Sequence, residues 1–257
     1  MLLLLVGLFG TVLSLSQISN WGAAALIPLV AGVTLLGVFA YAQSRSSQPL
    51  IRLALLRNRL VATSLTALIQ FAVLGTSVYL VLFLHHGLGS TVITAGLVLA
   101  LTGMFTPLLS ARTGALADRR GARTLVLPGL VLACVGLAWT GVAAQKLSLA
   151  WLIPGLLVFG VARPAIFTPA SVGPFIALPG EHRAFAASLV TEARQLGAVL
   201  GVAAMGLGYT VAGSTRLNAD ARVLADGFEA AMLTAAALVA VAAIVIAKRM
   251  PNVTATE

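Results

Sequence analysis

The feature that most constrains this chain is a series of long apolar runs, separated by short basic or turn-forming segments. Crossing about 30 Å of hydrocarbon takes about 20 helical residues, so runs of roughly that length predict transmembrane helices. Eight such runs occupy residues 2–15, 21–41, 61–84, 93–111, 124–144, 150–172, 184–212 and 228–247. The sequence therefore predicts an all-α integral membrane protein with about eight transmembrane helices, the first of which is short, as though its beginning were truncated.

The composition excludes a soluble fold. The chain is 60% hydrophobic and 9% charged, whereas a soluble domain carries about 25% charged residues. The formal net charge is +9, but no soluble basic face interleaved with aromatic residues accompanies it, so we expect no nucleic-acid partner. We expect a chain of this composition to have the lipid bilayer as a partner.

The basic residues fall on alternate connections between the predicted helices. Of the sixteen, twelve lie in one set of connections, three lie in the other set, and Arg163 lies inside a predicted helix. The larger set is Arg45, Arg52, Arg57, Arg59, Arg112, Arg119, Arg120, Arg123, Arg183, Arg194, Lys248 and Arg249, and the smaller is Lys146, Arg216 and Arg222. Because basic residues are kept on the cytoplasmic side, we expect a multi-pass protein of the inner (plasma) membrane with both termini in the cytoplasm.

Aromatic residues near helix ends support this threading. Trp and Tyr favour the headgroup region because their rings are amphipathic. The residues that we expect at the outer ends of their helices are Trp21, Tyr79, Trp139, Trp151 and Tyr209.

The connection between the fourth and fifth predicted helices carries the most specific motif. It runs Gly114-Ala-Leu-Ala-Asp118-Arg119-Arg120-Gly121-Ala-Arg123. An acid beside a helix start can accept hydrogen bonds from exposed backbone donors. The arginines can pair with carboxylates or with carbonyls at a helix C-terminus, and the glycines permit a sharp turn.

This motif resembles the signature loop of the major facilitator superfamily. The matching residues are Gly114, Leu116, Ala117, Asp118, Arg119, Gly121 and Arg123, and Ala122 stands where the family usually has a basic residue. The resemblance implies that Gly114, Leu116, Asp118, Arg119, Gly121 and Arg123 form a conformational latch, which breaks when the transporter changes the side on which it is open. The substitution at Ala122 implies a weaker charge relay.

Further stretches resemble the fourteen-helix drug:proton antiporters of that superfamily. They are Asn20-Trp21-Gly22, Gln48-Pro49-Leu50, Leu55 to Arg59, Tyr79 to Leu84, Gly87 to Gly89, Ala95 to Leu97 and Arg194 to Gly201. The resemblance implies two linker-type transmembrane helices over residues 1–43, a basic amphipathic segment on the cytoplasmic surface at 44–60, a six-helix C-terminal bundle at 61–250 and a cytoplasmic tail at 251–257. It implies that an N-terminal six-helix bundle is absent.

The function implied by this resemblance is proton-coupled efflux of bulky apolar or cationic compounds by alternating access. Drug-like small molecules and protons would be partners if an N-terminal bundle completed the protein, since such transporters rock one bundle against the other. The alternative is a truncated or non-transporting membrane module that is inactive without that bundle.

Arg163 is the most unusual residue within the predicted helices. Placing Arg deep in a membrane costs about 2.5–3.5 kcal/mol on insertion scales unless it meets water or a partner. Arg163 is therefore either a cation of the substrate pathway or a side chain that snorkels or pairs with a helix-end carbonyl. Arg194 and Gln195, near the cytoplasmic mouth, can bond across helices or reach the same pathway.

Small residues and prolines mark places where helices pack closely or bend. Gly197 and Gly201 form a small-residue face that favours close helix packing, or else a flexible gate. Pro164 beside Arg163 removes a backbone hydrogen bond, which produces either a static kink or a functional break.

No enzyme motif, cofactor motif or metal-ligand spacing is found in the sequence. Phosphate loops, dinucleotide fingerprints and metalloprotease pairs are absent, and Cys134 is the only cysteine. The adjacent His85 and His86 point in different directions on one helix and are more typical of an interface than of a metal site. We find no carboxylate in the predicted helix interiors, so a proton-coupling group is expected from another part of the transporter.

Overall fold

The computed structural model describes residue 34 and residues 59–172, 180–211 and 220–249. The chain divides into two compact units, Met1–Leu60 and Val61–Glu257. The predicted helices at 2–15 and 21–41, except for Thr34, and the predicted amphipathic segment up to residue 58 lie outside the described residues. The helices below belong to the second unit, apart from the first two residues of α4.

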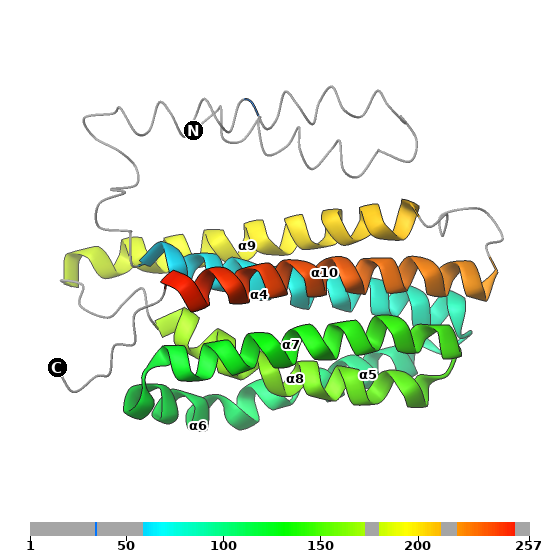
Figure 1. Ribbon diagram of the computed structural model, residues 1–257, viewed down its shortest axis with the longest axis horizontal. Helices are drawn as coiled ribbons and strands as arrows, with labels where there is room; N and C mark the ends of the chain where they lie inside the picture. Colours follow the sequence, from blue (N-terminus) through cyan, green and yellow to red (C-terminus); the bar gives the residue numbers. More distant parts are fainter. Residues whose placement is uncertain (1–33, 35–58, 173–179, 212–219, 250–257) are drawn as a thin grey trace. The chain divides into compact units, whose positions relative to one another are not determined.

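Every element in the described part of the chain is helical, which confirms the predicted all-α class. The long helices are α4 (Arg59–Leu82), α5 (Val92–Gly103), α6 (Phe105–Arg120), α7 (Ala122–Ala143), α8 (Leu149–Val172), α9 (Gly180–Val211) and α10 (Ala221–Arg249) (Figure 1). A π-helical turn, Phe83–Gly87, ends α4, and a 3-10 turn, Ala144–Lys146, ends α7.

Five helical segments among the described residues are long and apolar enough to cross a membrane. They are Leu65–Gly87, Val92–Arg120, Ala122–Lys146, Leu149–Ser171 and Ala221–Lys248. Each coincides with a predicted transmembrane run. The run predicted at 184–212 corresponds to α9, which is a continuous helix but is not among the five, because Arg194, Gln195, several glycines and Tyr209 dilute its apolar residues. The predicted total of eight is therefore confirmed only in part.

Consecutive connections lie at opposite ends of the helices (Figure 1). Gly121 alone separates α6 from α7 at one end, and the turn Ala144–Lys146 joins α7 to α8 at the other. A hydrogen bond from Arg123 to the Ala247 carbonyl, 2.7 Å long, places the end of α10 beside the α6–α7 turn. The alternation of ends is what successive membrane crossings require.

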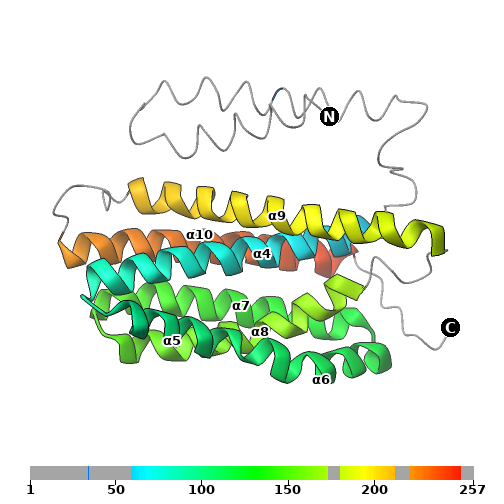
Figure 2. The same ribbon diagram turned by 180° about the vertical axis from the view of Figure 1, so that it is seen from behind.

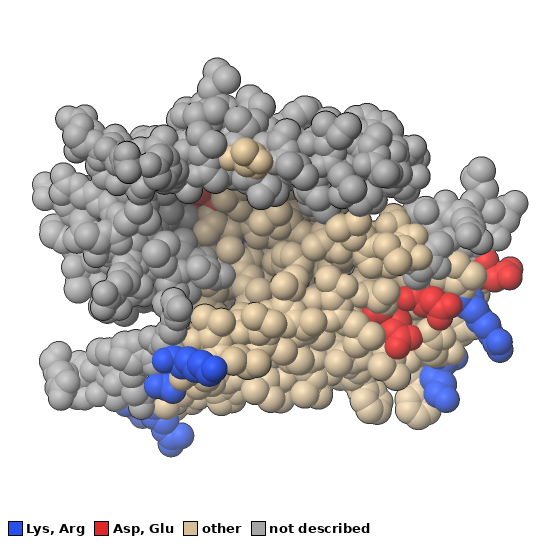
Figure 3. All heavy atoms as spheres, turned by 45° about the horizontal axis from the view of Figure 1, so that its top comes forward, with Lys and Arg blue, Asp and Glu red and all other residues tan. Residues whose placement is uncertain are grey.

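The two ends of the helices carry different charges. Arg119, Arg120, Arg123 and Lys248, with one acid, Asp118, lie at the end that holds the α6–α7 turn. The opposite end holds Lys146 and Arg222 together with the carboxylates Asp220, Asp226 and Glu229. Figure 3 shows Lys and Arg side chains at the left end of this face, and Asp and Glu beside Lys and Arg at the right end.

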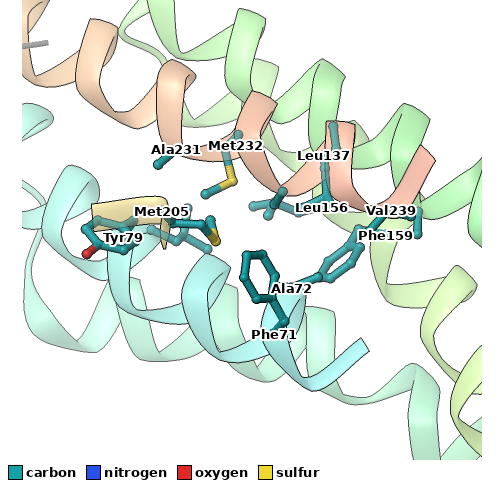
Figure 4. Close-up of a cluster of buried hydrophobic side chains, with 14 of the residues drawn as sticks. Phe71, Ala72, Tyr79, Leu137, Leu156, Phe159, Met205, Ala231, Met232 and Val239 are labelled. Atoms are coloured by element: carbon teal, nitrogen blue, oxygen red, sulfur yellow. The ribbon is translucent and has the colours of Figure 1, made fainter. Parts of the chain in front are cut away.

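The core is formed where α7 packs between α8 and α10, with α4 and α9 beside α10 (Figures 1 and 2). Among the fully buried side chains are Leu137 of α7, Leu156 of α8 and Met232 of α10 (Figure 4). Phe83 and Phe228 stack with ring centroids 4.7 Å apart and join the end of α4 to α10. Burial of these large apolar groups fixes how the helices pack.

Two facing glycines let α7 and α8 approach closely. A Cβ added at Gly136 would lie 2.8 Å from the carbonyl oxygen of Gly155, and one added at Gly155 would lie 2.8 Å from the carbonyl oxygen of Gly136. Neither backbone oxygen can move without shifting its helix. Close approach of this kind strengthens van der Waals packing, the main attraction between helices in a membrane.

Large apolar side chains also cover much of the outer surface. Val92, Ile93 and Leu97 of α5 are 71%, 76% and 66% exposed. Exposed apolar surface of this extent is typical of contact with lipid or with other apolar protein surface. Together with the five candidate spans, it identifies a multi-pass membrane protein.

Candidate functional site

The motif at residues 114–123 forms the end of one helix and the beginning of the next. Helix α6 continues to Arg120, and α7 begins at Ala122, so the turn between them is Gly121 alone. Gly121 has φ 84° and ψ 145°, a conformation that glycine adopts readily and other residues rarely do. The expected role of this glycine in a sharp turn is visible in the backbone.

Arg123 connects this turn to the last helix. Its Nη2 donates to the carbonyl oxygen of Ala247 over 2.7 Å, close to the end of α10. Carbonyls in the last turn of a helix lack helical partners and carry partial negative charge, so a guanidinium stabilises them. The structure thus shows Arg123 bonded to a helix-end carbonyl, one of the two kinds of partner expected for it.

The other polar residues of the motif have different surroundings from those expected. Asp118 lies in the last turn of α6 rather than beside a helix start, it is exposed, and no described residue donates a hydrogen bond to it. The beginning of α7 has no side-chain cap. The physical reason is that α6 extends farther than the predicted run, which ended at 111, because Ala, Leu and Arg favour a helix.

The beginning of the motif packs against α8. Gly114 faces the methyl group of Thr168, which a Cβ on Gly114 would approach to 3.6 Å. Thr113 Oγ1 donates to Thr168 Oγ1 over 3.3 Å, while Leu116 and Arg119 are exposed. The six predicted latch residues thus occupy one helix end and turn, where Gly114 meets α8 and Arg123 meets α10.

Gly197 and Gly201 lie where α9 crosses α4 (Figure 2). A Cβ on Gly197 would collide with the carbonyl oxygen of Ala67, and one on Gly201 with that of Phe71. The two helices therefore approach backbone to backbone at these positions. This geometry supports the packing interpretation of the small-residue face.

Tyr79 extends the same contact and corrects one expectation. Its hydroxyl donates to the Val202 carbonyl over 2.8 Å, and its ring lies 5.3 Å from that of Tyr209. Both tyrosines are buried, at 8% and 7% exposure, so they pack between helices instead of facing headgroups. Trp139 and Trp151, by contrast, are exposed side by side, with Trp139 Nε1 donating to the Trp151 carbonyl over 3.0 Å.

Arg163 lies near the middle of the span Leu149–Ser171. Its side chain is partly buried, and it forms no hydrogen bond or ion pair with any residue of the described ranges. Neighbouring positions show which way it faces: Gly160 contacts Phe105, and the Ala170 carbonyl accepts a hydrogen bond from Thr66 of α4 over 3.2 Å. Arg163 therefore projects between α4 and the α5–α6 pair.

Arg194 reaches the same side of α8, whereas Gln195 does not. The Arg194 guanidinium carbon lies 5.4 Å from the centre of the Phe167 ring, within cation–π range. Phe167 is one helical turn beyond Arg163 and so shares its face. Gln195 is exposed and has no hydrogen-bond partner in the part of the chain that the structure describes.

The prolines of α8 do not break their helix, which is continuous through Pro154, Pro164 and Pro169. The interruption between α5 and α6 is a single residue, Met104, which keeps helical dihedral angles and whose N–H donates to the Ala100 carbonyl, so the two form one span, Val92–Arg120. Pro107 lacks the N–H that would reach the Gly103 carbonyl, and the neighbouring Thr106 hydroxyl is buried without a described partner. Gly103 and Pro107 inside an apolar run were the available signal for this irregularity.

Two carboxylates lie near the beginning of a candidate span, outside its interior. Gln145 Nε2 donates to Asp226 Oδ1 and to Glu229 Oε2, over 2.7 Å each. Asp226 falls in Ala221–Lys248 because α10 begins seven residues before the predicted run, at Ala221 rather than Phe228, whereas Glu229 is the second residue of the predicted run. Both acids lie in the first turns of α10, at the end near Lys146.

The histidine pair lies in the π-helical turn after α4. Both rings are exposed and meet edge to face with centroids 4.9 Å apart, and His85 Nδ1 lies 3.2 Å from the Ser90 carbonyl. Within the described ranges, no three His, Cys, Asp or Glu side chains gather closely enough to hold a metal ion.

Comparison with known proteins places this arrangement in a family. The profile of the Major Facilitator Superfamily matches residues 1–202 and, in an overlapping alignment, residues 63–256. The lincomycin resistance protein LmrB of Listeria monocytogenes is 34% identical over 137 residues, which are 51% of this chain and 29% of that protein.

Two further relatives match longer stretches. The multidrug resistance protein B homolog of Mycobacterium tuberculosis is 29% identical over 185 residues, 70% of this chain and 34% of its own length. The methyl viologen resistance protein SmvA of Salmonella typhimurium is 30% identical over 190 residues, 70% of this chain and 37% of its own length. The matched part is thus about a third of each relative.

Proposed function

The chain belongs to the major facilitator superfamily, and from this we propose that it forms the C-terminal helix bundle of a multidrug efflux transporter. The transporter would export bulky apolar or cationic compounds in exchange for protons. The observation that carries this proposal is the superfamily's signature motif, folded as a glycine turn with Arg123 on the end of α10, in a chain similar to drug-resistance proteins.

Alternating access gives the motif its role. When one bundle rocks against another, connections on one face must form contacts in one state and lose them in the other. Arg123 provides a contact suited to this because a charge-assisted hydrogen bond to the exposed end of a helix can exchange with water at modest cost. In the state seen here the turn at Gly121 is held by Gly114 against Thr168 and by Arg123 on the Ala247 carbonyl, while Leu116, Asp118 and Arg119 are exposed and available for contacts in another state.

The membrane orientation follows from the charges. The end with the α6–α7 turn carries Arg119, Arg120, Arg123 and Lys248 against the single acid Asp118, whereas the other end mixes bases with Asp220, Asp226 and Glu229. Since basic residues are retained in the cytoplasm, we place the motif on the cytoplasmic face of the inner membrane. The termini are proposed to lie on that side as well.

Proton coupling requires a titratable group that is reached from within the membrane. Asp226 and Glu229 lie in the first turns of α10 and already accept hydrogen bonds from Gln145. We therefore expect the coupling carboxylate in the part of the transporter that packs against this bundle.

Dye export in an efflux-deficient bacterial strain tests the proposal. The chain is expressed alone and joined to the N-terminal bundle of a drug-resistance relative, and ethidium loss from preloaded cells is followed with and without a protonophore. The proposal predicts export by the joined protein that stops when the proton gradient collapses.

A matched variant is the same joined protein with Arg123→Gln, whose amide can still donate a hydrogen bond but carries no charge. Weaker export is expected from it. If the joined protein inserts in the membrane at normal levels and exports no dye, the drug-pump assignment fails and a non-transporting module is favoured.

A further inference from the structure

Four residues of α8 define a face that looks into the space between α4 and the α5–α6 pair. At about 100° per residue, Gly160, Arg163, Phe167 and Ala170 fall within about 80° of the helix circumference. Gly160 meets Phe105 and the Thr102 carbonyl, each 2.9 Å from where a Cβ would be, and Ala170 meets Thr66. Arg163 and Phe167 lie between these two contacts.

The proline-containing junction of α5 and α6 lies at the same depth as Arg163. Helix α8 runs beside the α5–α6 pair in the same direction, with Thr102 next to Gly160 and Thr113 bonded to Thr168. Thr106 and Pro107 are thereby brought to the level of Arg163. The Thr106 hydroxyl is buried with no partner among the described residues, and Pro107 cannot donate to the Gly103 carbonyl.

An unpaired guanidinium and an unpaired hydroxyl at mid-membrane depth are both costly. An Arg there is tolerated when it faces water or a partner, and a buried hydroxyl without a hydrogen bond loses about 1–3 kcal/mol. Both groups can donate hydrogen bonds. A ligand that stabilises both groups must therefore offer hydrogen-bond acceptors, and negatively charged acceptors form the strongest such bonds.

The surroundings add an aromatic surface and a second positive charge. Phe167 lies one turn from Arg163, and the Arg194 guanidinium lies over its ring at 5.4 Å. No described carboxylate forms an ion pair with Arg163 or Arg194. Asp118 and Glu192 are exposed. Asp226 and Glu229 accept hydrogen bonds from Gln145 at the opposite end of the helices. The face combines positive charge with an apolar wall.

We propose that Arg163 and Thr106 bind the acidic group of an aromatic organic anion, whose ring packs against Phe167 beside Arg194. This inference rests on the proposed transport function and adds aromatic carboxylates to its substrate class. The recognised chemistry is one delocalised negative charge attached to an apolar ring system. A bidentate carboxylate suits the planar fork of Arg163, and the Thr106 hydroxyl can donate to the same group.

Binding of three probes that share a naphthyl ring and differ in charge tests this site. The full chain is placed in lipid nanodiscs, and equilibrium dialysis measures 1-naphthylacetate, its methyl ester and 1-naphthylmethylammonium, with empty nanodiscs subtracted. We expect the acetate to bind at least about tenfold more tightly than the ester, because a single charge-assisted hydrogen bond at low dielectric contributes about that factor.

Variants assign the preference to the proposed residues. Arg163→Gln is expected to abolish the preference for the acetate, Arg163→Lys to retain part of it and Thr106→Val to reduce it about threefold, without change in ester binding. Arg222→Gln, which removes an exposed arginine at the beginning of α10, is the matched control and should leave the preference intact. Circular dichroism and gel filtration establish that each variant is folded.

Several results would overturn the anion site. Equal binding of acetate and ester, or the same loss in Arg163→Gln and Arg222→Gln, would do so, and so would failure of all three probes to bind. Ester or ammonium binding without any preference for the acetate would leave the transport proposal standing, whereas that proposal fails only if the joined protein exports no dye. The two failures are therefore distinguishable.

Discussion

Arg123 shows how one side chain can join two distant parts of the sequence. Its guanidinium lies in the first turn of α7 and donates to the Ala247 carbonyl near the end of α10, 124 residues later. Without the Arg123 guanidinium, the last carbonyl groups of α10 would be hydrogen-bonded only by water. Because the guanidinium is only half-buried, the bond contributes less than a buried charged pair would.

Replacement of Arg123 by Gln should lower stability modestly. We expect a loss of about 1 kcal/mol and a melting temperature lower by roughly 2–4 °C. Labelling of the half-buried Cys134 by a maleimide dye during heating measures this, because its sulfur lies against α10, 3.5 Å from the Ala236 carbonyl. The neighbouring Arg120→Gln, an exposed residue without a described partner, should melt like the unmodified protein; equal losses in both would contradict the role of the carbonyl bond.

Individual residues were predictable when their function follows from their type and position. Arg163 stands out because an ionised group in an apolar run is costly, and the motif predicts a turn at Gly121. Phe167 and Thr106 carry no such signal, because Phe and Thr are common in transmembrane helices. Their importance comes only from which helices meet around them.

Helix packing depends on the small residues of α9 where it crosses α4. At Gly201 any side chain would collide with the Phe71 backbone carbonyl, which cannot rotate away as a side chain could. At Gly96 of α5 a Cβ would meet no atom within 4 Å. These two glycines provide a matched pair with opposite surroundings.

Gly201→Val is expected to force α4 and α9 apart. Overpacking costs about 1–3 kcal/mol and can cost more when backbone must move, so melting should fall by roughly 3–10 °C. Gly96→Val, which makes the same chemical change, should have little effect. Thermal unfolding of both variants in detergent compares them directly, and equal shifts would show that the contact between α4 and α9 is not tight.

The proline within the span Val92–Arg120 leads to a second expectation for a whole helix. Pro107→Ala restores the backbone donor that the Gly103 carbonyl lacks. We expect a higher melting temperature, because the span gains one backbone hydrogen bond. Binding of 1-naphthylacetate should fall, because the helix straightens at this position and the Thr106 hydroxyl moves. An unchanged melting temperature together with unchanged binding would argue against a role for Pro107.

Hydrophobic runs were sufficient to predict the described helices but not their ends or irregularities. Length and apolarity locate a span because lipid requires every backbone group to be bonded within the helix. They do not show where a helix continues past its apolar residues. For this reason α8 is continuous through three prolines, α6 extends to Arg120, and α10 begins early enough to include Asp226.

The threading of the whole chain follows from charge and length together. The described helices reverse direction at Gly121 and again at Ala144–Lys146, and their two ends differ in charge. A bilayer imposes both features, because it admits apolar helices and retains arginines on one side. The substrate and the coupling ion depend on a partner bundle and so could not be predicted from this chain's pattern alone.

Accessibility labelling of two turns tests the membrane threading most directly. In a Cys134→Ser background, Arg120→Cys reports the α6–α7 end and Ser148→Cys the α7–α8 end. An impermeant maleimide applied to intact cells should label position 148 at once and position 120 only after the membrane is opened. Labelling of both positions from the same side would contradict the account.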